Sequence, residues 1–113
     1  MLVIDSDKVK AEKVQMEGAK DTTLQILIDH PPAPTFIMRR FRINPGGYTP
    51  MHAHDYEHEV YVLDGLGEVR DEKQSIPIKQ GSVVFIPPNE VHQFRNIGND
   101  DLIFLCIIPA KSP

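Results

Sequence analysis

The stretch GGYTPMHAHDYEHEVYVLDG, residues Gly46–Gly65, joins a glycine turn, a histidine cluster and an alternating apolar pattern. Three of the five histidines in the 113-residue chain, His52, His54 and His58, fall within seven positions of it. From His58 onward, valines recur at every second position, which predicts a strand that ends at the next glycine turn. The stretch therefore predicts a β-fold that concentrates its imidazoles in one place.

Short segments rich in β-branched and aromatic residues continue along the chain, separated by prolines and glycines. The expected strands are residues 23–28, 35–43, 58–65, 67–71, 75–79, 82–87, 91–96 and 102–108. NPGG, residues 44–47, is expected to be a turn, and residues 8–16 are the longest segment with any helical character. At least eight short strands at this spacing predict a β-sandwich, jelly roll or barrel.

The composition is typical of a globular protein, with 41% hydrophobic and 25% charged residues. The net charge of −4 argues against nucleic acid as a partner, because phosphate binding needs a basic surface. The single cysteine, Cys106, excludes an intrachain disulfide and favours a reducing compartment. The N-terminus lacks the apolar core of a signal peptide, and the apolar run 102–108 is too short to cross a bilayer. We therefore expect a cytoplasmic protein that binds neither nucleic acid nor membrane.

The three clustered histidines share even parity, so their side chains would point to one face of an extended strand. His92 lies on another expected strand, after the turn PPNE. Clustered neutral imidazoles are good ligands for manganese, iron, nickel, copper or zinc. A His-x-His pattern alone supports metal binding and an ordinary surface role equally. The third imidazole, in register with the other two, favours metal binding. His30, beside a proline, is assigned the ordinary role.

Two spaced patterns resemble the two motifs of the cupin family. The first, G-x5-H-x-H-x3/4-E-x6-G, is matched by Gly46, His52, His54, His58 and Gly65. The second, G-x5-P-x-G-x2-H-x3-N, is matched by Gly81, Pro87, Asn89, His92 and Asn96, with asparagine in place of a glycine. Asparagine tolerates a left-handed backbone, so the turn should form. The resemblance implies one all-β cupin domain over residues 1–113, a jelly-roll barrel of residues 23–108 preceded by an arm of residues 1–22.

The glutamate of the first motif can be matched in two ways, by Glu59 or by His58. The six-residue distance to Gly65 and the strand parity both favour His58. The sequence then resembles a subset of small cupins with a four-histidine centre, some of which bind manganese. The resemblance implies one divalent transition metal per chain, Mn(II) first, with Fe(II), Cu(II), Ni(II) and Zn(II) as alternatives. The implied ligands are His52, His54, His58 and His92.

The resemblance also implies an activity, that of a metal-dependent oxygenase of the dioxygenase type acting on a small organic substrate. Two alternatives remain open: a redox-neutral isomerase, decarboxylase or lyase, and a non-catalytic ligand-binding or sensing module. Four uncharged donors would leave the charge of the ion uncancelled, so we expect the ligand to be anionic. The sequence identifies no catalytic side chain.

Strand parity nominates further residues for the substrate pocket. Tyr56 has the parity of the histidine cluster, and Phe94 has that of His92. Arg39 is a candidate for binding a substrate carboxylate, although a solvated position fits it equally well. The last strand contributes Phe104, Cys106 and Ile108 on one face, which is either the inner or the outer one. A core role for the aromatic residues and a buried, inert thiol are the simpler interpretations.

The last strand is apolar on both faces, so we expect it to be covered on both sides. The barrel interior would cover one side, and a partner sheet or subunit would cover the other. Small single-domain cupins are often dimers. We therefore expect a homodimer built from the N-terminal segment and an edge strand.

Overall fold

The computed structural model describes residues 1–110, which form nine strands and one short 3-10 helix. The helix, η1 (Ser6–Lys8), lies in the N-terminal arm, where the Asp5 side chain accepts from the Asp7 N–H. The strands are β1 (Glu12–Lys13), β2 (Lys20–Ile28), β3 (Phe36–Tyr48), β4 (His58–Asp64), β5 (Leu66–Arg70), β6 (Ser75–Lys79), β7 (Val83–Ile86), β8 (Gln93–Asn96) and β9 (Leu102–Pro109). Each of the eight expected strands is present, and the prediction of an all-β fold is confirmed. Residues 111–113 of the expected domain lie outside the described residues.

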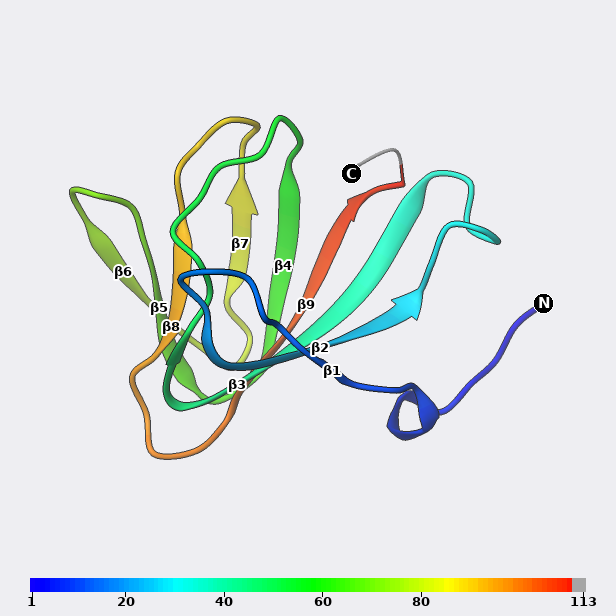
Figure 1. Ribbon diagram of the computed structural model, residues 1–113, viewed down its shortest axis with the longest axis horizontal. Coiled ribbons are helices and arrows are strands. Elements are labelled where there is room, and N and C mark those ends of the chain that lie inside the picture. The colour runs from blue at the N-terminus through cyan, green and yellow to red at the C-terminus, as the bar shows by residue number, and fades with distance from the viewer. Residues whose placement is uncertain (111–113) are drawn as a thin grey trace.

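The strands pair antiparallel in the order β6-β5-β8-β3-β9-β4-β7, and β2 adds to β3 with β1 beside it. The sheet curls on itself (Figure 1). It stays a half-barrel because β6 and β7, at the two ends of this strand order, do not pair with each other. The two motif regions meet in this curl, because β4 and β8 both lie within two strands of β3. No helix within residues 1–110 has the length and apolarity needed to span a membrane.

Two local expectations are wrong. NPGG does not separate two strands, because residues 44–47 lie inside β3. The register between β2 and β3 shifts opposite this segment, between Lys20 and Thr22. Gly46 has a φ of +82°, and a Cβ on Gly47 would lie 2.6 Å from the Lys20 carbonyl oxygen. The glycines therefore form an irregularity that the strand passes through. The second error concerns residues 8–16, which form the end of η1 and β1 rather than a longer helix.

Burial alternates along β4 and β9, and the even-numbered residues face the interior. At one end of the half-barrel Ile43, Val62 and Leu102 have no exposed surface. Their strands are in register there, with Ile43 opposite Leu102. The Asn96 side chain donates to the Ile43 and Asp100 carbonyl oxygens, both at 2.8 Å, and so ties β8 to the same place. We call this region, residues 43, 62, 96 and 102, the closed end.

Candidate metal and ligand site

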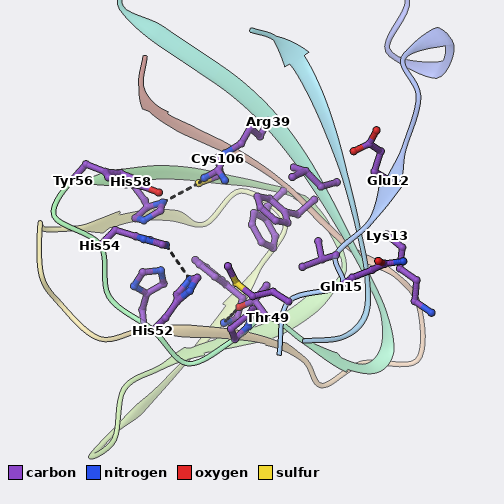
Figure 2. A pocket seen from close by; sticks show the side chains of 18 residues that line it. Glu12, Lys13, Gln15, Arg39, Thr49, His52, His54, Tyr56, His58 and Cys106 are labelled. Atoms are coloured by element: carbon purple, nitrogen blue, oxygen red, sulfur yellow. Dashed lines mark hydrogen bonds between the residues drawn. The ribbon is translucent and has the colours of Figure 1, made fainter. Parts of the chain in front are cut away.

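The other end of the half-barrel contains a cavity of about 350 Å³, which we call the open end. Its volume lies in the range of small-molecule pockets. Figure 2 shows His52, His54 and His58 on one side of the cavity, with Glu12, Lys13 and Gln15 of the N-terminal segment on the opposite side. The wall between them is apolar and aromatic, made by Leu24, Phe41, Phe94 and Phe104 with Met16.

The structure brings His52, His54, His58 and His92 together, but not along one extended strand as the parity argument assumed. Residues 51–57 form an irregular loop, and only His58 belongs to β4. Backbone hydrogen bonds position the loop: the His52 N–H donates to the His92 carbonyl at 3.1 Å, and the His92 N–H donates back at 2.9 Å. The Asn89 N–H donates to the His54 carbonyl at 2.6 Å. Asn89 has a φ of +70°, so this asparagine does adopt the left-handed backbone expected of it.

The imidazole rings are close neighbours. Ring centroids lie 4.2 Å apart for His52 and His54, 4.8 Å for His58 and His92, and 5.2 Å for His52 and His92. The Nε2 atoms of His52 and His54 are 3.2 Å apart. The Nδ1 of His92 lies 3.0 Å from the Glu90 carbonyl, to which it can donate, leaving the Nε2 lone pair free. The Nδ1 of His58 lies 3.4 Å from the Cys106 sulfur, and its buried Nε2 has no hydrogen-bond partner.

All four imidazoles have lowered pKa values. Burial is the main cause, and it lowers the pKa of His52 to about 4 and that of His58 to about 3. Burial also lowers the pKa of His54 and of His92. The neighbouring imidazoles and Arg39 lower these values further, because each would place a second positive charge nearby. At neutral pH the rings are uncharged and have lone pairs available for a ligand.

The donor chemistry fits the metal ion that the sequence resemblance implies. The rings are neutral, and the Nε2 of His58 is a buried polar atom without a partner. The 3.2 Å between the His52 and His54 nitrogens is close to the ~3.3 Å expected for two tetrahedral ligands with bonds of ~2.0–2.1 Å. In their present rotamers, however, no three His, Cys, Asp or Glu side chains of residues 1–110 form a ready-made metal-binding group. A complete ligand set would require some of the rings to turn.

The structure also separates the two candidates for the third position of the first motif. His58 is 5% exposed and faces the cavity. Glu59 is exposed on the opposite face of β4. Of the two, His58 is the residue placed to act in the cavity.

The other nominated residues surround the imidazoles, with one exception. Tyr56 stacks on His54 with 4.8 Å between ring centroids and 12° between ring planes. Arg39 and Cys106 lie beside His58 in Figure 2, and Phe94 packs on Phe104 at 4.7 Å. Burial raises the pKa of the Cys106 thiol, so it stays protonated at neutral pH. The exception is Ile108, which is a buried core residue and does not line the cavity.

Part of the cavity wall was not foreseen from the sequence. Residues 12–16 belong to the segment expected to be an arm outside the barrel, yet they line the cavity. Thr49 and Pro50 line it as well, and the Thr49 hydroxyl accepts from the Phe94 N–H at 2.9 Å. These residues carry no motif and no periodic signal. The N-terminal segment is held at the cavity by the pairing of β1 with β2 and by the Val14 N–H, which donates to the Thr22 carbonyl at 2.9 Å.

Comparisons with known proteins agree with this architecture. The Cupin_2 model, a cupin domain, matches residues 39–108. The oxalate-binding protein of Thermotoga maritima is 33% identical over 114 residues, covering 95% of this chain and 93% of that protein. The polyketide cyclase RemF from Streptomyces resistomycificus has a TM-score of 0.93 and 37% identity, covering 100% of this chain and 82% of that one. A structure described as a predicted oxalate decarboxylase from Thermotoga maritima has a TM-score of 0.85 and 31% identity, covering 96% and 98%. The chain thus belongs to the cupin family.

Proposed function

We propose that this cupin binds a divalent metal ion through its imidazole cluster and catalyses redox-neutral ring closure of a small poly-ketone. The observation that carries the proposal is the joining of two features in one cavity. Neutral imidazoles with free nitrogens line one side, and an aromatic wall suited to an organic substrate lines the rest. Likeness to a polyketide cyclase over the whole chain supports this reaction class.

The residues that would hold the ion are His52, His54, His58 and His92, with Mn(II) as the first candidate. Fe(II), Cu(II), Ni(II) and Zn(II) remain alternatives, because imidazole is a ligand for all of them. When bound, the ion would supply a positive charge that polarises a ligand oxygen. One relative is named for binding oxalate and the other for cyclising polyketides. Oxalate and a β-diketone both carry two neighbouring oxygen atoms, so both could bind one metal ion through the pair.

The chain's own residues would orient the substrate and move its protons. Burial raises the pKa of Tyr56, so its hydroxyl keeps its proton at neutral pH and can donate it to a carbonyl oxygen. The apolar wall of Phe41, Phe94 and Phe104 would fold the chain of ketones and exclude water. In the net reaction an acidic C–H adds to a ketone carbon, a C–C bond forms, and water leaves. No oxidant is consumed.

The cavity size favours this reaction over oxalate binding as the main role. Oxalate is much smaller than a 350 Å³ cavity and has no apolar surface to place against three phenyl rings. The oxygenase activity expected from the sequence has no support among the relatives described above, whose names give binding, decarboxylation or cyclisation. Ring closure belongs instead with the redox-neutral alternatives.

The metal part of the proposal is tested by elemental analysis of untagged protein purified without chelators. We expect about one equivalent per chain, by analogy with mononuclear sites. The double variant His52→Ala, His54→Ala should lose it, because two of the nitrogens are removed. His30→Ala is the matched control, since among the described residues the imidazole of this exposed histidine contacts only the Ala33 carbonyl, far from the cluster in sequence and outside the cavity lining. Folded wild-type protein that rejects every divalent ion offered would refute the metal site.

The chemical part is tested with a synthetic linear poly-β-ketone acid. We expect the metal-loaded protein to accelerate formation of the ring-closed aromatic product, followed by its ultraviolet absorbance, without any change in dissolved oxygen. Oxygen consumption in step with product formation would refute ring closure and restore the oxygenase interpretation.

The homodimer also belongs to the proposal. The outer face of β4, edge strand β7 and β9 exposes the apolar side chains of Tyr61, Val83 and Phe85 around Glu59. Residues 1–4 of the N-terminal arm are exposed and apolar as well. A second copy would cover both surfaces. Sedimentation equilibrium should give twice the chain mass, and a monomer at all concentrations would contradict the dimer.

A further inference from the structure

Arg39 is a cation in the cavity wall, and no carboxylate of residues 1–110 forms an ion pair with it. It lies in β3 opposite Cys106 of β9, and its Nη2 donates to the Cys106 sulfur at 3.0 Å. Its guanidinium carbon lies 5.0 Å from the centroid of the Phe41 ring, and its buried Nε has no partner. A thiol sulfur is a weak acceptor, so the guanidinium retains unused donors. Leaving such donors unpaired costs stability, which a bound anion would recover.

The neighbouring arginines are paired differently. Arg40 bonds to Ser6 at 2.9 Å and lies 3.9 Å from an Asp7 oxygen, and Arg42 bonds to Asp101 at 2.8 Å. Within residues 1–110, Arg39 makes no ion pair. The cavity has one lining carboxylate, Glu12, and it is offset by Lys13. The positive charge of Arg39 therefore has no counterion in the described part of the wall.

We propose that Arg39 binds a carboxylate of the substrate, so that the site takes free keto acids in preference to neutral ketones or esters. This inference rests on the proposed function and names its substrate class. A guanidinium can hold a carboxylate through two parallel N–H···O bonds, and the Phe41 ring supports its plane. Only the Cys106 sulfur separates Arg39 from His58. A carboxylate on Arg39 thereby directs the adjoining ketone toward the imidazoles.

The test compares two probes that differ in the carboxylate, acetoacetate and acetylacetone. Titration calorimetry on metal-loaded wild-type protein should show acetoacetate binding about tenfold to a hundredfold more tightly, the range for hydrogen bonds to a charged group. Arg39→Gln should abolish this preference. Arg40→Gln is the matched control, because it removes the same charge from the next residue of β3, outside the cavity, and should keep the preference.

Arg39→Lys is a second variant that keeps the test usable if Arg39→Gln does not fold. It keeps the charge but loses the planar fork, so it should retain a reduced preference. Equal affinity of the wild type for both probes, or binding of neither, would overturn the inference. The proposed function fails separately: wild-type protein that prefers acetoacetate, loses this preference in Arg39→Gln and yet closes no ring in the linear poly-β-ketone acid would leave Arg39 as an anion-binding residue and refute the cyclase.

Discussion

The closed and open ends of the half-barrel are built by the same strands, β3, β4 and β9, yet they differ in how completely their groups are satisfied. At the closed end Ile43, Val62 and Leu102 are fully buried, and the Asn96 amide has two carbonyl partners. At the open end His58 and Arg39 each keep a buried nitrogen that has no hydrogen-bond partner within residues 1–110. The closed end thus pairs its buried polar groups within the fold, while the open end retains polar groups that a ligand can satisfy.

The largest effect is expected at the closed end. Leu102→Ala should lower the free energy of unfolding by about 2–5 kcal/mol, because it leaves a cavity among fully buried neighbours. Leu105→Ala, on the outer face of the same strand, is the control and should cost clearly less. Urea denaturation measures both. Equal losses would mean that the closed end is not the stabilising region.

A pH titration should show that the stability of the metal-free protein depends on pH, because the imidazoles of the open end are buried in their neutral form. Folded His52 and His58 have pKa values of about 4 and 3, against an ordinary value of 6.5. The unfolded chain therefore binds more protons below pH 6.5, and stability falls as the pH decreases toward the folded pKa values. We expect metal-free protein to lose about 2 kcal/mol for each of these two histidines between about pH 7 and pH 5. Constant stability over this range would contradict the burial of neutral imidazoles.

The smallest effect has the opposite sign. His58→Leu should raise the stability of metal-free protein by about 1 kcal/mol, because it removes a buried nitrogen without a partner. The same variant should bind metal more weakly and show a shallower pH dependence. Asn96→Leu is the contrast at the closed end, where it breaks satisfied hydrogen bonds and should destabilise. A destabilised His58→Leu would show that this histidine serves the fold.

The strands and the four clustered imidazoles could be predicted from the sequence, but the argument for the histidines used a wrong assumption about the backbone. The histidine parity assumed an extended strand, whereas residues 51–57 form a loop that is held by hydrogen bonds to His92 and Asn89. The spacing still led to four histidines that the fold brings together, because it matched a family motif rather than a local geometry. NPGG was misread for a related reason: glycine allows a turn and an irregular strand equally, and pairing with β2 decides between them.

Alternation and motif spacing are local properties, so they were enough to predict the all-β fold, the family and the histidines of the candidate site. The folded structure was needed to see which face of β9 is inside and that residues 12–16 line the cavity. It was also needed to see that, among residues 1–110, Arg39 makes no ion pair while Arg40 and Arg42 do. These facts depend on contacts between strands that are distant in sequence, such as Arg39 with Cys106. Local pattern carries no record of such contacts, because the register of a curled sheet is set by the packing of the whole barrel.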